Sequence, residues 1–334
     1  MTHRLANVTM NNSVPIESST PRQVAVVVTV YNKSPYVRAS IESVLTQSYA
    51  PIELVIVDDG STDGSWDVVQ SAAVGSGATL VRLSNGGVSK ARNLGFKACR
   101  TRPTYLLFLD GDDVLQPDAL QRMVTHMDQH GTAAMCYSVP ILIDEADTVL
   151  GIDADQVRWA STKLGRRRMP DTEIDTPIEV IWSRFRAMPS ACLVRCSSYE
   201  KTNGWDESLC RPARPFQAED KDMAIQLALT GLIHRLATPT VKYRVLPTTH
   251  RQALYEGLLA VDRKWWNASL STEARRRIRR AIRFDSLVVM LDAVSELRIA
   301  LRSGSFRETV AANRKLMRAT IRWACLPVRL RKSA

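Results

Sequence analysis

The sequence predicts an α/β fold with a doubly wound, mostly parallel sheet and helices on both faces. Residues 54–57 and 105–109 are apolar runs without alternation, as in strands that are buried on both faces. Both runs end in acids, at Asp58-Asp59 and at Asp110-Gly111-Asp112-Asp113. Around them, strand-like runs alternate with segments of helical periodicity, which is typical of βαβ units.

The elements follow in order along the chain. A first strand covers 24–30, and Ser34-Pro35 begins a helix, because Ser is a favoured N-cap and Pro a favoured first helical residue. Pro51 ends that helix before the second strand. The alternation continues through a helix from Asp63 or Ser65, a strand over 79–83, a helix over 88–99, the strand ending at Leu109, a helix over 117–129 and a strand over 133–139.

The second half of the chain is less regular. Residues 144–175 lose periodicity, which indicates a long surface loop over one edge of the sheet. A strand is predicted over 191–194, and a helix over 218–230 follows it. Beyond Arg251 the pattern changes to amphipathic helices alone.

Composition and charge divide the 334 residues into three parts. Residues 1–22 are polar and rich in Asn, Ser, Thr and Pro, so we expect a disordered segment and not a signal peptide. Residues 23–250 form the predicted α/β domain. Residues 251–334 form a basic helical extension, with 19 Lys and Arg against 7 Asp and Glu. No apolar stretch reaches the roughly 18 residues that a membrane span needs.

Cysteines and histidines show no recognisable metal or disulfide framework. The six cysteines lack a CxxC pair, which favours reduced thiols and a cytoplasmic protein. His126 and His130 are four residues apart on a predicted helix, but they lack the Glu of an HExxH site. We interpret them as part of a solvated helix face, with a metal-binding pair as the alternative.

The two acidic strand ends are the most informative feature. Open α/β sheets bind ligands at the carboxyl edge of their strands. The acids of 58–59 and 110–113 have no Lys or Arg within their clusters, and such acids repel one another unless a cation neutralises them. A divalent metal is the simplest such cation.

Six segments in order resemble the motifs of the inverting family 2 glycosyltransferases of GT-A fold, and the resemblance covers about 24–246. A lone DxD is a weak signal, but six segments in register are specific. They are Val30-Tyr31-Asn32, Val57-Asp58-Asp59-Gly60-Ser61-Thr62-Asp63, Asn85-Gly86-Gly87-Val88-Ser89-Lys90-Ala91-Arg92-Asn93, Leu109-Asp110-Gly111-Asp112-Asp113, Gly204-Trp205-Asp206-Glu207 and Ala218-Glu219-Asp220-Lys221-Asp222.

The resemblance implies a site for a nucleotide-sugar donor. Thr29, Tyr31 and Asp59 match the nucleobase pocket, where an aromatic ring stacks on the base and a carboxylate accepts from its N–H. Asn32 is assigned to the donor site with them. An alternative at the second acidic strand end is an acid-rich helix N-cap, and Asp58 or Asp63 could likewise cap the helix that follows the first.

By the same resemblance, Asp110 lies at the ribose and metal side and Asp112 is the metal ligand, with Asp113 as a further candidate. Carboxylates and phosphates together suit Mn²⁺ or Mg²⁺, which would neutralise the diphosphate as it leaves.

Lys90 and Arg92 follow the Gly86-Gly87 turn and are assigned to the donor diphosphate, because backbone N–H groups and a cation suit phosphate oxygens. The alternative is a strand-to-helix turn with solvated charges. The spacing of a P-loop is absent.

Asp220 matches the general base of the family, which takes the proton of the acceptor hydroxyl. Glu219, Trp205 and Asp206 are assigned more weakly to the acceptor side. The alternatives are an acidic first helical turn for Glu219-Asp220 and a core position for Trp205. Leu246 stands where many members have a His, and His250 is a candidate substitute.

The basic extension has the profile of helices that lie on an anionic membrane, and a helical cap on the core is the alternative. The leading hypothesis is transfer of a sugar from a UDP-sugar to a glycan or lipid-linked acceptor in surface polysaccharide synthesis, at the inner face of the cell membrane. Alternatives are a sugar nucleotidyltransferase and a non-catalytic membrane- or nucleic-acid-binding protein. No nucleic-acid motif accompanies the charge, so no nucleic-acid partner is expected.

Overall fold

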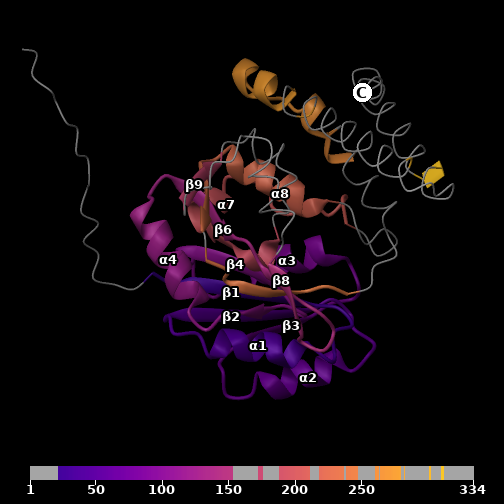
Figure 1. The fold of residues 1–334 in the computed structure, drawn as a ribbon. Helices are drawn as coiled ribbons and strands as arrows, with labels where there is room; N and C mark the ends of the chain where they lie inside the picture. Colours follow the sequence, from indigo (N-terminus) through magenta and orange to yellow (C-terminus); the bar gives the residue numbers. More distant parts are fainter. Residues whose placement is uncertain are drawn as a thin grey trace, which may run out of the picture.

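Figure 1 shows the computed structural model, which describes residues 22–152, 172–175, 188–210, 218–236, 238–246, 260–262 and 264–279 and, beyond these, only positions 282, 301, 310 and 311. The segment predicted to be disordered lies outside the described residues except for Arg22.

The principal sheet has eight strands in the order β3-β2-β1-β4-β10-β6-β11-β9. The first four are mutually parallel, β10 is antiparallel to β4 and β6, and β9 is an antiparallel edge strand. The prediction of a mostly parallel sheet is therefore confirmed. The bounds are β1 (Val24–Val30), β2 (Ile52–Asp58), β3 (Thr79–Arg82), β4 (Tyr105–Asp110), β6 (Ala133–Ser138), β9 (Thr172–Asp175), β10 (Cys192–Arg195) and β11 (Leu232–Leu236).

A second sheet has the order β5-β12-β7-β8. Its strands are β5 (Val114–Leu115), β7 (Ile141–Ile143), β8 (Val149–Ile152) and β12 (Val241–Arg244). The predicted loop over 144–175 is wrong in part, because β8 and β9 both fall within it. β8 gives no clear pattern because Val149, Leu150 and Ile152 are all exposed.

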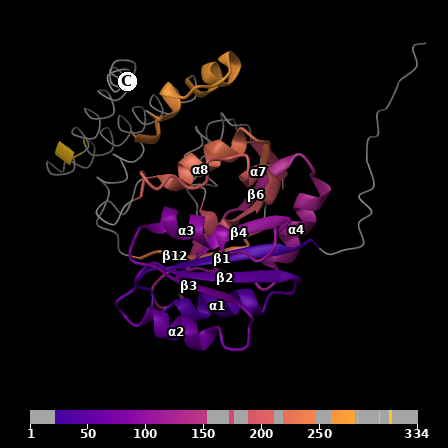
Figure 2. The same cartoon turned by 180° about the vertical axis from the view of Figure 1, so that it is seen from behind.

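Helices cover both faces of the principal sheet (Figures 1 and 2). Helices α1 (Val37–Leu45), α2 (Ser65–Ala72) and α4 (Ala119–Gln129) pack against one face. Helices α3 (Val88–Lys97), α7 (Cys196–Tyr199) and α8 (Glu219–Ala228) pack against the other, and η1 (Pro189–Ala191) precedes β10. This arrangement confirms the predicted doubly wound architecture.

The core runs through β1, which is buried along its whole length. Val26 and Val28 belong to the cluster on the side of α1 and α4, whereas Ala25 and Val27 belong to the cluster on the side of α3 and α8. Burial of each such valine contributes about 1.5–3 kcal/mol. The apolar run of β1 is therefore a strand buried on both faces, as its lack of alternation predicted.

The described part of the basic extension packs on the α/β domain. Residues 260–262, 264–267 and 272–279 are helical. Val261, Trp266 and Ile278 form a buried cluster with Leu209 and with Ile225 of α8. The described residues of the extension thus form a helical cap on the core, which was the alternative to helices lying on a membrane. Among the described residues, no helix is both long and apolar enough for a membrane crossing.

Candidate active site

The carboxyl ends of β1, β2 and β4 meet at one edge of the principal sheet. Thr29 of β1 is in register with Val57 of β2 and with Asp110 of β4. The Thr29 hydroxyl donates to Oδ1 of Asp110 over 3.3 Å. The two acidic strand ends, 52 residues apart as Asp58 and Asp110, therefore lie on the two strands that flank β1.

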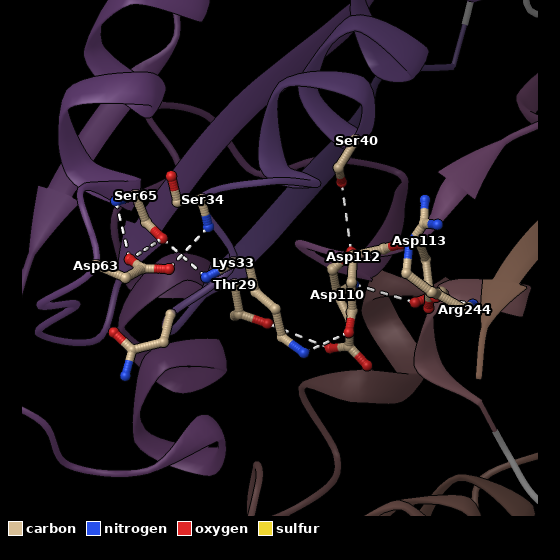
Figure 3. A network of polar contacts seen from close by, with 12 residues as sticks. Thr29, Lys33, Ser34, Ser40, Asp63, Ser65, Asp110, Asp112, Asp113 and Arg244 are labelled. Carbon is tan, nitrogen blue, oxygen red and sulfur yellow. Dashed lines mark hydrogen bonds and ion pairs between the residues drawn. The ribbon is translucent and has the colours of Figure 1, made fainter. Parts of the chain in front are cut away.

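Gly111 allows the turn after β4 to lie against β1. Its N–H donates to the Thr29 carbonyl over 2.9 Å, and a Cβ at this position would lie 3.0 Å from that oxygen. Asp113, the last acid of this cluster, is fully buried and accepts a hydrogen bond from the backbone N–H of Arg244 over 2.9 Å. Burial raises the pKa of Asp113 well above its usual range. Asp113 thus anchors β12 and is a poor candidate for the metal role (Figure 3).

Asp112 has a basic partner that does not belong to its own acidic cluster. Nζ of Lys33, from the loop after β1, lies 2.5 Å from Oδ2 of Asp112 (Figure 3). Burial raises the pKa of Asp112, and the Lys33 ammonium opposes that shift. The expectation that these acids lack cationic partners is wrong, because the loop after β1 ends at the same edge as β4.

The donor atoms of this edge fit a divalent cation. Asp110 and Asp112 are 30% and 13% exposed, so both carboxylates can be reached from solvent. Oδ1 of Asp110 accepts from Thr29 and Arg92, whereas its Oδ2 accepts no hydrogen bond from any residue in the described ranges. Carboxylate oxygens are the ligands that Mg²⁺ and Mn²⁺ prefer. Lys33 would have to share or leave Asp112 when an ion binds.

Asp59 holds the glycine turn that leads into α3. Its two carboxylate oxygens accept the N–H groups of Gly86 and Gly87, each over 2.8 Å. The side chain is 3% exposed, and burial raises its pKa although both amides oppose the shift. Gly60 has φ +78°, and a Cβ there would lie 2.8 Å from the nitrogen of Asn85. The two motifs are thus packed directly against each other.

Arg92 is the most enclosed charge of the site. Its side chain is 2% exposed, with Nη2 2.9 Å from Oδ1 of Asp110 and Nη1 3.0 Å from Oδ1 of Asp220. Glu219 lies 3.8 Å from Nη1. Burial alone would lower the pKa of the guanidinium, but the acids outweigh it and raise the pKa. The alternative of a solvated charge is therefore wrong for Arg92.

Asp220 is the second residue of α8, which begins after Ala218 in a left-handed conformation with φ 59°. Burial raises the pKa of the Asp220 carboxyl well above its ordinary value, Glu219 raises it further, and Arg92 opposes the shift. The side chain is still 37% exposed, so the carboxylate faces open space as well as Arg92. A carboxylate with a raised pKa is a stronger base.

Trp205 is not available to stack on a sugar, because its side chain is 4% exposed. The guanidinium of Arg92 lies 4.3 Å from the Trp205 ring, and Phe108 meets the ring edge-on at 5.3 Å. The core alternative for this residue is the one observed. Asp206 accepts from Nζ of Lys264 over 2.8 Å, which ties the proposed acceptor side to the basic extension.

The remaining predicted residues lie around the β1 end. Tyr31 is 46% exposed, and the side-chain oxygen Oδ1 of Asn32 accepts from the N–H of Thr62 over 2.9 Å. Lys90 lies along Gly86, where a Cβ would come 2.5 Å from its Cδ. Asp63 accepts from the N–H of Ser65, the first residue of α2, over 3.0 Å, although the N-cap of α2 is Gly64 and has no side-chain cap hydrogen bond (Figure 3). His250 lies outside the described residues.

Comparison with known proteins decides the family. Residues 25–188 match the model of glycosyl transferase family 2. The chain contains a family 2 glycosyltransferase domain. An uncharacterized glycosyltransferase of Bacillus subtilis, EpsJ, is 35% identical over 108 residues, which cover 32% of this chain and 31% of EpsJ. The minor teichoic acid biosynthesis protein GgaA of the same organism is 37% identical over 102 residues, 29% of this chain and 23% of GgaA. These alignments span a third or less of either relative.

Solved structures show that the family 2 domain has the GT-A fold. Staphylococcus aureus TarS 1–349 in complex with UDP superposes with a TM-score of 0.56 and 20% identity, covering 78% of this chain and 70% of TarS 1–349. Mannosyltransferase PcManGT of Pyrobaculum calidifontis, in complex with GDP-Man and Mn²⁺, gives a TM-score of 0.58 at 17% identity, with 92% of this chain and 88% of PcManGT covered.

Proposed function

We propose that this protein is a metal-dependent, inverting glycosyltransferase that moves a sugar from a nucleoside diphosphate to a hydroxyl of a glycan or lipid-linked acceptor. The observation that carries the proposal is the guanidinium of Arg92, which bonds Asp110 and Asp220 at once. The planar guanidinium thereby holds Asp110, which is proposed to bind the donor, and Asp220, which is proposed as the base, at its two terminal nitrogens.

The donor would lie along the ends of β1, β2 and β4. Tyr31 offers an exposed ring for the base, and Asp59 retains a second lone pair on each oxygen beside its amide bonds. Thr29, Asn32 and Lys90 surround the same edge. The printed ligands of TarS and PcManGT, UDP and GDP-Man, support a nucleoside diphosphate, and we propose a UDP-sugar as the first donor to test.

Asp110 and Asp112 are the residues that would hold Mn²⁺ or Mg²⁺. Such an ion, when bound, supplies positive charge to the diphosphate oxygens. The Mn²⁺ in the PcManGT complex supports this assignment. On the protein side, Lys33 neutralises Asp112 when the metal is absent.

The transfer step would run between the two acids that Arg92 joins. An acceptor hydroxyl attacks the anomeric carbon while the bond from that carbon to the diphosphate oxygen breaks, so the configuration inverts. Asp220 takes the hydroxyl proton and holds it after the step. Arg92 keeps the base oriented and offsets the charge of Asp110, because one side of its guanidinium bonds each acid.

The acceptor proposal rests on the relatives and on the basic extension. GgaA is a minor teichoic acid biosynthesis protein, which supports a role in the synthesis of a surface polymer. Exposed Arg276 in the described part of the extension is compatible with a nearby anionic surface. We therefore propose peripheral attachment to the inner face of the cell membrane, tested by sedimentation with phosphatidylglycerol vesicles with and without residues 280–334.

Release of nucleoside diphosphate from a panel of UDP- and GDP-sugars, with Mn²⁺, with Mg²⁺ and with EDTA, tests the proposed activity. We expect turnover with at least one sugar nucleotide and a metal, and its loss in Asp112→Ala. Pyrophosphate in place of nucleoside diphosphate would indicate a nucleotidyltransferase. Turnover that is unchanged by EDTA would contradict the metal requirement.

A further inference from the structure

Three histidines converge between α4 and β11, away from the proposed active site. His126 and His130 lie one turn apart at the end of α4, and His234 comes from the middle of β11. One ring nitrogen of each residue lies within 4.8 Å of those of the other two. The expectation of a solvated helix face is wrong for His126, which is 8% exposed, because β11 packs against this side of α4.

The spacing of the rings suits a tetrahedral metal ion. Nε2 of His126 lies 3.2 Å from Nδ1 of His234. An ion at about 2.0–2.1 Å from each of two imidazole nitrogens holds them roughly 3.3–3.4 Å apart. Two histidines at i and i+4 on one helix face are also the spacing with which helices present ligands to zinc.

The backbone sets the orientation of His130. Nδ1 of His130 lies 2.8 Å from the carbonyl oxygen of His126, so Nδ1 carries the proton and donates it. Nε2 of His130 is then left with a free lone pair. A hydrogen bond from the second ring nitrogen to a carbonyl is the usual support of a metal-binding histidine.

His234 is 2% exposed, and its Nε2 has no hydrogen-bond partner among the described residues. If His234 accepts from His126, its buried Nε2–H has nowhere to donate; if it donates, Nε2 is a buried lone pair without a proton. Either arrangement leaves a polar atom that costs free energy to bury. A metal ion on Nδ1 of His234 would replace the contact with His126 and hold the ring proton on Nε2.

The surroundings of the histidines favour neutral imidazole rings, which are the form that binds a metal ion. Burial, followed by the neighbouring rings of His130 and His234, lowers the pKa of His126 to about 4, so that ring is neutral at pH 7. The guanidinium of Arg195 approaches the end of α4, where its Nη2 donates to the carbonyls of Met127 and His130. The half-buried His130 leaves a side from which water can complete the coordination.

We infer that His126, His130 and His234 form a binding site for a transition-metal ion of the Zn²⁺ class, with a water molecule as a fourth ligand. Three imidazoles suit Zn²⁺ and its neighbours in the first transition row, whereas Mg²⁺ and Mn²⁺ prefer oxygen. This site is separate from the acids of the donor edge. β4 and β6 run in the same direction, because both are antiparallel to β10, which lies between them. His130 lies just before the first residue of β6, whereas Asp110 is the last residue of β4, so the two sites lie at opposite edges of the sheet.

The site would join α4 to β11 across 108 residues of sequence. Its role would be structural, since the three side chains lie on the face of the sheet opposite to Asp220 and α8. Binding to the folded protein alone raises its stability. Zn²⁺ should therefore raise the melting temperature of the full chain.

The test uses tag-free, full-length protein stripped with EDTA and dialysed against Zn²⁺ alone. We expect one tightly bound Zn²⁺ per chain and a Zn²⁺-dependent rise in melting temperature. In His130→Ala, whose ring is only half-buried, and in His126→Gln, the affinity should fall at least tenfold and the rise should vanish. His3→Ala and Asp112→Ala serve as controls and should bind Zn²⁺ as the wild type does.

Co²⁺ offers a readout that does not depend on stability. Its visible absorption should report nitrogen coordination in the wild type and lose that signature in His130→Ala. Undiminished Zn²⁺ affinity in His130→Ala, or no saturable binding to the wild type, would overturn the assignment. Loss of binding in Asp112→Ala would move the Zn²⁺ to the donor edge, which also overturns it.

Discussion

Nη1 of Arg92 lies 3.0 Å from Oδ1 of Asp220, although the two residues are 128 positions apart. Arg92 comes from α3 and Asp220 from the first turn of α8, and the same guanidinium reaches Asp110 at the end of β4. Three elements of the fold thus meet on one buried cation. This contact fixes the position of the candidate base relative to the donor edge of the sheet.

Replacing Arg92 by Met should impair both stability and turnover. Removing one partner of a buried ion pair costs about 3–5 kcal/mol, and the partial exposure of Asp110 and Asp220 reduces that expectation to about 2 kcal/mol. Misplacement of the base should lower kcat by about 10²-fold. Urea unfolding and nucleoside diphosphate release measure the two effects. Arg92→Lys should recover part of the stability, and equal behaviour of the Met and Lys variants would contradict the pairing.

The pKa of Asp220 should be visible in the pH profile. A base acts only when it is deprotonated, so kcat/KM should fall as the pH drops through the raised pKa of Asp220. The acidic limb should therefore lie above the ordinary carboxylate range of about 4. Arg92 opposes the raised pKa, so Arg92→Met should move the limb to higher pH. Lys97→Met removes an exposed cation of the same helix and should leave the acidic limb in place. An acidic limb that also stays in place in Arg92→Met would exclude the electrostatic coupling between Arg92 and Asp220.

Lys33 should compete with the metal for Asp112. The two side chains are in contact in the protein without metal, so an ion must displace or share the ammonium. In Lys33→Met, Mn²⁺ should bind the donor-free protein about fivefold more tightly, since an ion pair of this kind is worth up to about 1 kcal/mol. Calorimetric titration with Mn²⁺ measures the change. Lys90→Met serves as the comparison, and equal affinities in both variants would argue against competition.

Asp222 should hold the basic extension to α8. It is 1% exposed and accepts from Nζ of Lys264, Nε1 of Trp265 and Nε2 of Gln226, at 2.8, 2.8 and 2.9 Å. Asp222→Ala leaves these donors unpaired, which should cost about 3 kcal/mol and open residues 260–279 to proteases. Asp67→Ala removes an exposed acid from the first turn of α2 and should change neither. A cleavage pattern identical to that of the wild type would show that other contacts hold the extension.

Much of the domain could be predicted from local patterns. β1, β2 and β4 follow from apolar runs, and their acids from the residues at which those runs stop. β8 and β9 could not be predicted in this way, because β8 exposes its apolar side chains and both are short strands at sheet edges. Asp63 shows the limit of a motif, since its carboxylate is occupied by the N–H groups of Ser34 and Ser65.

The partners of the acids depended on the tertiary fold. Lys33 was visible in the sequence beside Tyr31-Asn32, but its contact with Asp112 requires that two loops end at one sheet edge. Burial of Arg92 likewise depends on α8, more than a hundred residues later. His234 is the clearest case, because nothing near it in the sequence points to His126 and His130.

The role of Asp220 is the central claim, and Asp220→Asn tests it most directly. The amide keeps the shape of the side chain and an oxygen for Arg92, but it cannot accept the proton of the acceptor. Donor affinity, measured by calorimetric titration with the sugar nucleotide and Mn²⁺, should stay within about twofold of the wild type, while transfer should fall by about 10²–10⁴-fold. Near-normal transfer by Asp220→Asn would contradict the account.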